Sequence, residues 1–271
     1  LPYIPGAEAS GTVVEVGPDV KDIKIGDRVV YGISNGYGSY AELYAVPSWH
    51  LFKFPSSVDF QTAAAVMLQG MTAHYLTHST YSLKPNNTAL IHAAAGGTGL
   101  LLVQISKLLG ARVIGTVSTE EKAQLARAAG ADMTINYAKR DFAAEVRTLT
   151  DGKGVNLVVD MLSGPVVAQT MRATALLGRI VNVGRLAGMK AEFDFDLHAL
   201  RRIDYIGVTF RTRTLEEVRE INRRMGADLW QAVTAGKLKL PIDRRFPLDE
   251  AAAAQVHMRE NKHFGKIVLT M

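Results

Sequence analysis

The stretch from Thr88 to Tyr137 constrains the fold of this chain more than any other part of its sequence. It begins TALIHAAAGGTGLLLVQISKLLG, in which an apolar run meets a turn of small residues and a helical pattern follows at once. A second apolar run, Arg112 to Val117, precedes another helical pattern and another glycine, Gly130. This order of strand, tight turn, helix, strand and helix predicts a βαβ unit, with glycines where its helices should end.

The turn reads Ala94-Ala95-Gly96-Gly97-Thr98-Gly99, a variant of G-x-G-x-x-G with alanine in the first glycine position. Small residues let the backbone approach a pyrophosphate, whose negative charge then lies against the N-terminus of the helix. Because the turn stands between a predicted strand and a predicted helix, it indicates dinucleotide binding. A tight strand-to-helix turn without a ligand is the alternative, and it stays open.

The end of the second strand bears on which dinucleotide is bound. An NAD site usually carries Asp or Glu about 20 residues beyond the glycines, where it accepts a hydrogen bond from the ribose 2′-OH. This chain has Ser118 there, followed by Thr119-Glu120-Glu121-Lys122. A hydroxyl and a lysine favour a 2′-phosphate, so these residues favour NADP(H). Two alternatives stay open: Glu120 could turn toward a ribose, and Ser118 with Glu121 has the spacing of a helix capping box.

The rest of the chain predicts a parallel sheet inserted in a β-rich domain. Residues Leu1 to Pro55 consist of short apolar runs punctuated by glycines, which is typical of a small antiparallel barrel or sandwich. Residues 57–78 read as a helix, and strands then alternate with helices as far as a long helix from Thr214 to about Ala235. Six such strands give a doubly wound α/β sheet. The last strand, Lys266 to Thr270, is expected to pair back into the N-terminal β domain.

We therefore predict three segments: a β-rich domain at 1–62, a dinucleotide-binding domain at 63–238 and a return segment at 239–271. Within the second segment, the pattern predicts a helix over 165–177 that ends at Gly178, and a sixth strand over Asp204 to Phe210.

Composition excludes several classes of protein. The net charge is +5, but the basic residues are scattered in doublets such as Arg201-Arg202, so nucleic-acid binding is not favoured. The chain has no cysteine, which excludes disulfides and thiolate zinc sites and is compatible with a reducing cytoplasm, where we expect the protein to act. The nearly uncharged stretch Thr88 to Ser106 has the length of a membrane span, but its central glycines argue against one.

Six stretches follow one another along the chain: PGAEASGTVVEVGPDVKDIKIGDRVV, MLQGMTAHYL, AAAGGTG, TEEKAQLARAAGAD, INY and ENKHFGKIVL. Together they resemble the zinc-independent medium-chain dehydrogenase/reductases, and within them the NADPH:quinone oxidoreductases, the zeta-crystallin-like group. The resemblance covers essentially the whole chain. It implies a GroES-like catalytic β domain flanking a Rossmann domain, with the cofactor in the cleft between them.

The resemblance also implies roles for individual residues. The pyrophosphate would be held by Ala95, Gly96, Gly97, Thr98 and Gly99. The adenosine 2′-phosphate would be bound by Lys122 and Tyr137, next to Ser118. The nicotinamide half would be approached by Gln69, Thr72, Gly184, Phe210, Arg211 and Asn261. Structural alternatives remain, since Tyr137 could pack on the sheet edge and Phe210 in the core.

Two features bear on the chemistry. Where zinc-dependent members of the family have a metal-binding histidine before a glutamate, this chain has Ala7 before Glu8, and with no cysteine present a zinc-catalysed reaction is excluded. The family also normally carries roughly fifty to sixty residues before the position of Leu1. We therefore expect a fragment, a processed form or a truncated chain, which leaves the activity of this polypeptide open.

The leading hypothesis is hydride transfer from NADPH to a quinone or an α,β-unsaturated carbonyl, without a metal. The alternatives are an enoyl or alkenal reductase of the same family, and a crystallin-like protein that binds NADPH without turnover. No catalytic residue follows from the sequence: Tyr37 and Tyr40 are candidate proton donors, but turn packing explains them better. The resemblance further implies a homodimer that pairs through the strand at Asp204 to Phe210.

Overall fold

The computed structural model describes residues 3–32, 37–260 and 263–271. The chain divides into two compact units: a flanking unit made of Leu1–Thr72 and Phe210–Met271, and a sheet unit made of Ala73–Thr209. Helix α1 (Phe60–His78) runs from the first unit into the second. The domain boundaries that we predict at residues 62 and 238 stay predictions.

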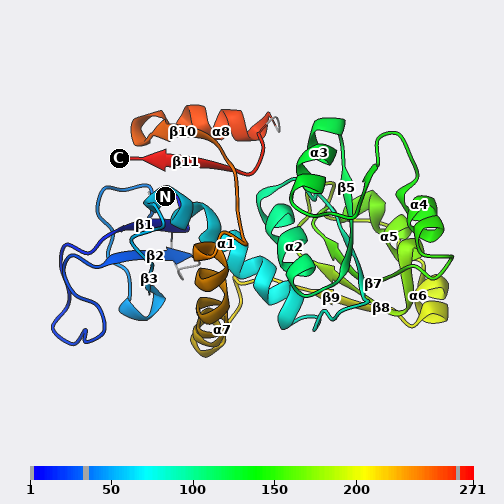
Figure 1. The fold of residues 1–271 in the computed structure, drawn as a ribbon, viewed down its shortest axis with the longest axis horizontal. Helices are drawn as coiled ribbons and strands as arrows, with labels where there is room; N and C mark the ends of the chain where they lie inside the picture. Colours follow the sequence, from blue (N-terminus) through cyan, green and yellow to red (C-terminus); the bar gives the residue numbers. More distant parts are fainter. Residues whose placement is uncertain (1–2, 33–36, 261–262) are drawn as a thin grey trace. The chain divides into compact units, whose positions relative to one another are not determined.

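The sheet unit contains a parallel sheet of six strands in the order β6-β5-β4-β7-β8-β9 (Figure 1). The strands are β4 (Thr88–Ile91), β5 (Arg112–Val117), β6 (Met133–Asn136), β7 (Val155–Asp160), β8 (Thr174–Asn182) and β9 (Asp204–Gly207). The first strand in the chain, β4, lies inside the sheet, and β5 and β6 extend the sheet from it to one edge. The later strands β7, β8 and β9 extend the sheet from the other side of β4. This order confirms the doubly wound sheet, and it creates a switch point between β4 and β7, where ligands of such sheets bind.

Helices cover both faces of this sheet. Figure 1 shows α2 (Gly97–Leu108) and α3 (Glu120–Ala128) on one side, and α4 (Phe142–Leu149), α5 (Val167–Ala173) and α6 (Phe195–Arg201) on the other. The core under α4 and α5 includes Leu90, Val158, Ile180 and Met171, all fully buried. The strand residues that alternate with these, such as Ile91, Leu157 and Val181, are also fully buried. Both faces of the strands are therefore apolar, which explains why β4 and β7 read as continuous hydrophobic runs rather than alternating ones.

Side chains fix where the helices begin. Asp141 accepts hydrogen bonds from the backbone N–H groups of Ala143 and Ala144, as expected for the residue that begins α4. At α3 the capping residue is Thr119, which accepts from the N–H of Lys122. The Ser118–Glu121 capping box that the spacing allows is therefore wrong by one residue, because Thr119 takes the extended conformation before the helix.

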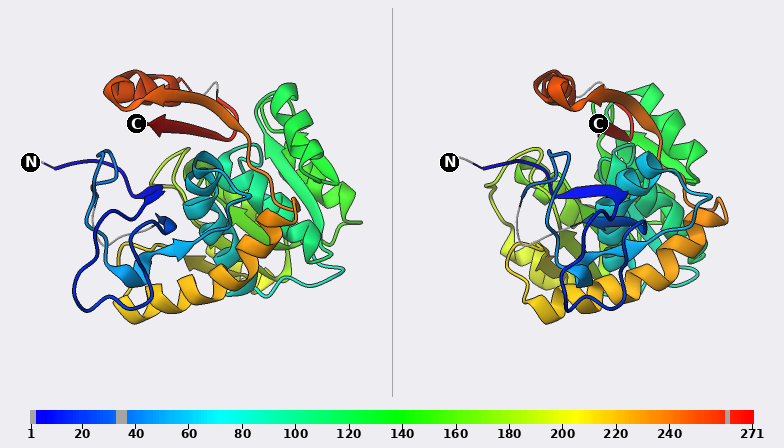
Figure 2. Two further views of the ribbon diagram at one scale, coloured as in Figure 1. Left: turned by 60° about the vertical axis from the view of Figure 1, so that its left-hand side comes forward. Right: turned by 90° about the vertical axis from the view of Figure 1, so that its left-hand side faces the viewer.

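The flanking unit contains two small sheets. Strands β1 (Glu8–Thr12), β2 (Arg28–Gly32) and β3 (Phe52–Lys53) form an antiparallel sheet in that order. The short helical turn η1 (Ser48–His50) comes directly before β3 in the chain. Strands β10 (Ile242–Pro247) and β11 (Lys266–Thr270) pair in parallel, joined by η3 (Leu248–Glu250) and helix α8 (Ala251–Arg259), which lies beside them (Figures 1 and 2). Helix α7 (Leu215–Thr234) completes the unit.

The C-terminal strand therefore pairs with β10 rather than with β1, β2 or β3. Its link to the N-terminal strands is made by a side chain instead: the Lys266 ammonium donates to the Glu8 carboxylate of β1. The same ammonium donates to the side-chain oxygen of Gln69 on α1, 3.1 Å away. A residue near the end of the chain thus joins elements that lie far from it in sequence.

Two predicted boundaries in the sheet unit are wrong. The helix predicted over 165–177 ends at Ala173, after a short turn, η2 (Gly164–Val166), and β8 begins at Thr174. Leu176 and Leu177 extend the helical pattern in sequence, but both are exposed, and Leu177 has a φ of 59°. The sixth strand ends at Gly207 rather than at Phe210.

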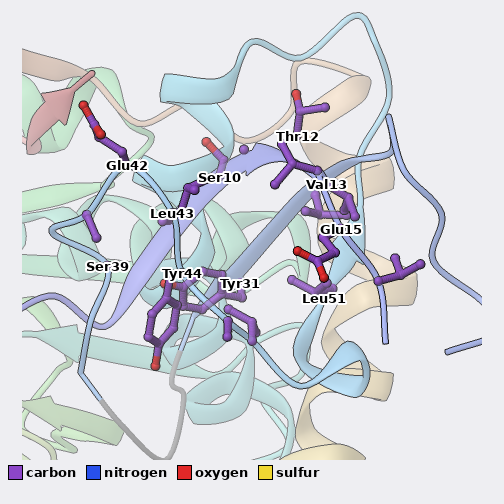
Figure 3. A pocket seen from close by; sticks show the side chains of 18 of the residues that line it. Ser10, Thr12, Val13, Glu15, Tyr31, Ser39, Glu42, Leu43, Tyr44 and Leu51 are labelled. Carbon is purple, nitrogen blue, oxygen red and sulfur yellow. The ribbon is translucent and has the colours of Figure 1, made fainter. Parts of the chain in front are cut away.

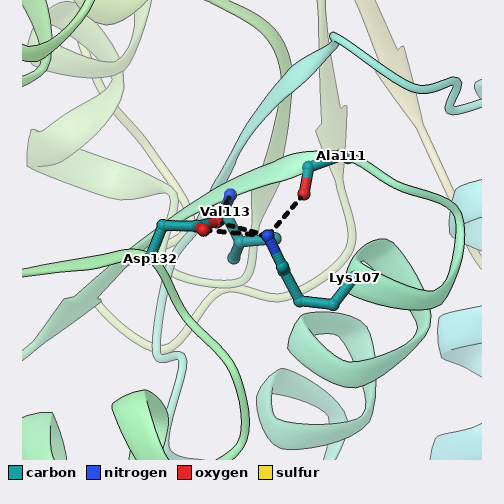
Figure 4. A network of polar contacts seen from close by, with 4 residues as sticks. All are labelled: Lys107, Ala111, Val113 and Asp132. Carbon is teal, nitrogen blue, oxygen red and sulfur yellow. Dashed lines mark hydrogen bonds and ion pairs between the residues drawn. The ribbon is translucent and has the colours of Figure 1, made fainter.

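A polar contact joins α2 to the beginning of β5 (Figure 4). The Lys107 ammonium donates to the carbonyl of Ala111 at 3.1 Å and to both carboxylate oxygens of Asp132 at 2.8 and 2.9 Å. Asp132 in turn accepts from the N–H of Val113 at 2.6 Å. Burial tends to raise the pKa of Asp132, but Lys107 and this N–H outweigh it and lower the pKa. This charged contact holds the C-terminal end of α2, which is the end farther from the glycine turn.

Among the described residues, the helices are too short or too polar to cross a membrane.

Candidate functional site

The glycine turn forms a tight connection between β4 and α2. The backbone N–H of Ala94 donates to Thr116 in β5 at 3.1 Å, and the N–H of Gly96 donates back to Ala93 at 3.0 Å. Ala93 has a φ of 49°, in the left-handed region. A Cβ on Gly99 would lie 2.3 Å from the carbonyl oxygen of Ala93. Glycine is therefore required at position 99, because the helix packs directly against the backbone of the turn.

The N-terminus of α2 has the features of an anion site. Gly96 precedes the helix in an extended conformation, and no side chain caps it. Helix geometry leaves the N–H groups of Gly97, Thr98 and Gly99 without acceptors inside the helix. On Gly96, which is exposed, a Cβ would have only the oxygen of Ala93 within 4 Å. An anion can therefore approach this backbone closely, and the residues present fit the pyrophosphate of a dinucleotide.

The residues predicted to bind a 2′-phosphate lie near the end of β5. Ser118 is half-buried directly after the strand, and Lys122, also half-buried, stands on the first turn of α3. The N–H of Tyr137 donates to the carbonyl of Val117 at 3.1 Å, and the Tyr137 side chain is 41% exposed. The structure thus brings the backbones of these three predicted residues to one strand end, although they are spread over 20 positions of the sequence.

Glu120, the residue that could favour a ribose hydroxyl, has another partner in this structure. Its carboxylate pairs with the Arg127 guanidinium along α3, and Arg127 also donates to the hydroxyl of Thr134 in β6 at 2.6 Å. This pair is exposed, so it contributes little to stability. It does hold the Glu120 carboxylate against the helix surface, where it bonds Arg127.

Gly184 lies just beyond the carboxyl end of β8, at the same sheet edge as the glycine turn. Its N–H donates to the carbonyl of Asp160 at 3.2 Å, and a Cβ on Gly184 would lie 2.6 Å from the carbonyl oxygen of Met161. The end of β8 is therefore packed against the end of β7 with no room for a side chain. The carboxyl ends of parallel strands are where such sheets bind ligands, which is consistent with the predicted role of Gly184.

The other predicted residues belong to the flanking unit. Gln69 accepts from Lys266, and the Thr72 hydroxyl donates to the carbonyl of Leu68 at 2.8 Å, within α1. Phe210 is half-buried and Arg211 is exposed. Asn261 lies outside the described residues. Roles for these five residues toward a nicotinamide stay predictions.

The sequence did not indicate the partners of Glu8. One carboxylate oxygen of Glu8 accepts from the N–H of Leu68 at 3.0 Å, and the other accepts from the Lys266 ammonium. Both charged side chains are only 17% exposed. Glu8 therefore connects β1, α1 and β11, which is a structural use of the glutamate that follows Ala7. No local pattern predicts it, since Lys266 is 258 positions away.

A separate hollow in the flanking unit encloses about 590 Å³ (Figure 3). It is lined by β1, the loop that follows it, and the segment that carries Leu43 and Tyr44. Tyr31 and Tyr44 stack on one another at its wall, with ring centroids 5.7 Å apart. Burial raises the pKa of Tyr31 to about 12. This hollow contains none of the residues predicted to bind the cofactor.

A buried histidine lies beneath the glycine turn. His92 follows β4 and is fully buried; its two ring nitrogens bond the hydroxyls of Thr116 and Thr170, at 2.8 and 3.1 Å. Phe142 packs against the ring edge-on, and the Asp160 carboxylate lies close enough to act on its charge. Burial lowers the pKa of His92 to about 4, although Asp160 opposes the shift. The ring is therefore neutral at pH 7.

This histidine predicts a loss of stability in mild acid. An unfolded histidine has a pKa near 6.5, so between about pH 6.5 and 4 the unfolded chain takes up a proton that the folded chain refuses. The free energy of unfolding should therefore fall as the pH is lowered through this range. In His92→Gln, which retains hydrogen-bonding groups but cannot titrate, the slope should be smaller by about 1.4 kcal/mol per pH unit.

Urea unfolding at pH 7, 6 and 5 measures this slope. His50, whose pKa burial also lowers to about 4, titrates in both proteins and cancels from the difference. Equal slopes for the two proteins would show that His92 has the same pKa in the folded and the unfolded chain, which would contradict the shift attributed to its burial.

Two protein-family models match the chain. Residues 1–56 match the model described as "Alcohol dehydrogenase GroES-like domain", and residues 97–225 match the model described as "Zinc-binding dehydrogenase". This chain has Ala7 before Glu8 and contains no cysteine, so it offers no thiolate ligand for zinc.

Relatives with assigned activities share most of their length with the chain. It is 38% identical to a 2-haloacrylate reductase from a Burkholderia species, over 99% of the chain and 81% of that protein. It is 37% identical to the quinone oxidoreductase of Pseudomonas aeruginosa, over 99% of the chain and 82% of that protein. The structure of Escherichia coli quinone oxidoreductase complexed with NADPH is similar, with a TM-score of 0.91 and 32% identity over 98% of the chain and 82% of that protein. The chain belongs to the medium-chain dehydrogenase/reductase family, in its zinc-independent quinone oxidoreductase branch.

Proposed function

We propose that this protein transfers a hydride from NADPH to a quinone or an α,β-unsaturated carbonyl, without a metal. The observation that carries the proposal is the uncapped N-terminus of α2, where Gly96 and Gly99 keep the backbone open to a pyrophosphate. The relatives support it, because a quinone oxidoreductase and a 2-haloacrylate reductase are similarly close to the chain. The structure of one relative was solved with NADPH.

The acceptors named by these relatives share one chemical feature. Quinones and 2-haloacrylates both have a carbon–carbon double bond conjugated to a carbonyl or carboxyl group. Such a bond accepts a hydride at one end, because the carbonyl oxygen takes up the negative charge that develops. An acceptor of this kind needs no metal to activate it, which agrees with a family branch that does not use zinc.

The residues of the sheet unit would bind and orient the cofactor. The N–H groups of Gly97, Thr98 and Gly99 would donate to the pyrophosphate, with the helix dipole adding to the attraction. Lys122, Ser118 and Tyr137 would bind the 2′-phosphate at the end of β5. The backbone at Gly184, which packs closely against Met161, would lie beside the nicotinamide half beyond β8. When bound, NADPH supplies the hydride, and the protein supplies orientation and a dry environment.

Two alternative functions are compatible with the same cofactor site. An enoyl or alkenal reductase would differ only in its acceptor. A crystallin-like protein would bind NADPH without turnover. No catalytic residue is proposed, and a cytoplasmic place of action stays a prediction.

The 2′-phosphate assignment predicts how Lys122→Ala changes cofactor choice. Removal of a charged donor should weaken NADPH binding about tenfold and leave NADH binding unchanged. The matched control is Lys153→Ala, since Lys153 is exposed in the turn before β7, at the opposite edge of the sheet. Fluorescence titration with both cofactors, followed by cofactor oxidation at 340 nm with 1,4-benzoquinone and with trans-2-hexenal, tests binding and turnover together.

Oxidation of NADPH with either acceptor supports the proposed reaction. Which of the two acceptors is reduced distinguishes a quinone reductase from an alkenal reductase. Tight NADPH binding with neither acceptor reduced would overturn the reaction in favour of the non-catalytic alternative. Equal loss of NADPH and NADH binding in Lys122→Ala would overturn the 2′-phosphate assignment.

We also propose that two copies associate through β9. This strand ends the order of the sheet, so among the described residues its outer edge has no partner strand. Ile206 is half-buried there. An unprotected edge favours pairing with a second chain. Light scattering should give a mass of twice 29.4 kDa, and Ile206→Lys should shift it toward the monomer, whereas Leu177→Lys, at an exposed site elsewhere, should not. A monomeric wild-type protein would refute the association.

A further inference from the structure

The segments that leave β7 and β8 are joined by a buried polar cluster formed by Asp160, Ser163, Asn182 and the backbone of Gly184. The Ser163 hydroxyl donates to the carbonyl oxygen of Gly184 at 2.7 Å, and the side-chain amide of Asn182 donates to the Ser163 oxygen. The Asp160 side chain accepts from the N–H groups of Leu162 and Ser163, both at 2.9 Å. The three side chains are less than 10% exposed, so this cluster is shielded from water.

The backbones of the two segments are also bonded to one another. In addition to the bond from Gly184 to Asp160, the N–H of Leu186 donates to Met161 at 3.2 Å and the N–H of Ala187 donates to Leu162 at 2.8 Å. The position of the chain after β8 therefore depends on the conformation of the chain after β7. Ser163 is the residue whose side chain bridges the two.

Ser163 holds an unusual backbone conformation. Its φ is 55° and its ψ is −156°, a combination that is essentially restricted to glycine. A glycine at this position would avoid the strain, and the chain does have one at the next position, Gly164. The serine side chain is therefore present at a conformational cost, and its hydroxyl accepts from Asn182 and donates to Gly184. Backbone strain of this kind is concentrated at functional sites.

We propose that Ser163 is a positioning residue, whose hydroxyl fixes the Gly184 peptide against which the nicotinamide half of the cofactor lies. This inference rests on the proposed function, which assigns the carboxyl edge of the sheet to NADPH. Ser163 acts through Gly184, because its own side chain is buried and bonded on both sides. The glycine turn follows β4, and the 2′-phosphate residues follow β5 and β6 or stand on α3, so the adenosine half of the cofactor does not depend on Ser163.

The two halves of the cofactor provide the test. The ligand 2′,5′-ADP carries the adenosine and 2′-phosphate only, whereas NADP⁺ also carries the nicotinamide. In Ser163→Ala, which removes the hydroxyl, calorimetry should show NADP⁺ binding weakened about tenfold and 2′,5′-ADP binding unchanged within about twofold. Turnover with NADPH should show a lower kcat, because a misplaced nicotinamide is poorly oriented for transfer.

Ser163→Gly separates the hydroxyl from the backbone strain. Glycine adopts the observed φ and ψ freely, so this variant should be at least as stable to urea as Ser163→Ala, yet it should show the same loss of NADP⁺ binding. The matched control is Ser106→Ala, which removes another buried serine hydroxyl, on α2, and should leave both affinities unchanged. Recovery of wild-type NADP⁺ affinity in Ser163→Gly would show that strain, not the hydroxyl, matters, and would overturn the proposal.

The other outcomes are equally distinct. Equal weakening of 2′,5′-ADP and NADP⁺ in Ser163→Ala would assign the cluster to general stability and overturn the positioning role. Wild-type protein that binds both ligands, with Ser163→Ala behaving identically, would overturn this inference and leave the proposed function intact. Wild-type protein that binds neither ligand would overturn the proposed function itself.

Discussion

The candidate site depends on one steric constraint, the direct packing of helix α2 against the backbone of the turn that precedes it. The missing side chain at Gly99 allows this approach, since a Cβ there would overlap the carbonyl of Ala93. The close packing fixes the direction of the first turn of α2, and with it the direction of three N–H groups that no side chain caps. A helix N-terminus held in this way favours an anion before any ligand arrives, because its dipoles need not reorganise.

The order of the strands then brings further groups to the same edge of the sheet. The sheet extends from β4 to β5 and β6 on one side and to β7 and β8 on the other. All these strands are parallel, so their carboxyl ends lie at the same edge of the sheet. Ser118 and Tyr137 follow β5 and β6, and Gly184 follows β8. His92, neutral and bonded to Thr116 and Thr170, supports the turn from below without contributing a charge. The glycine turn, Ser118 and Tyr137 therefore lie on one side of the switch point between β4 and β7, and Gly184 lies on the other.

The sequence predicted the parts of this arrangement that local chemistry determines. Apolar runs, glycine turns and Asp141 as a helix cap are short-range signals, and the strands β5 and β11 have the predicted bounds. The errors occur where tertiary contacts compete with the pattern. Leu176 and Leu177 read as helix because they continue an apolar spacing, yet they are exposed in β8. The Glu8–Lys266 contact and the Ser163 conformation have no local signal, because one joins distant segments and the other is a serine in a glycine conformation.

The central claim is that NADPH binds along the carboxyl edge of the sheet, with its pyrophosphate on the turn before α2. Hydrogen–deuterium exchange with and without NADPH locates the ligand directly, because bound N–H groups exchange more slowly. We predict slower exchange at residues 96–100 and 118–122, with little change around the hollow of the flanking unit. Slower exchange confined to residues 9–46, or no change at the glycine turn, would contradict the account.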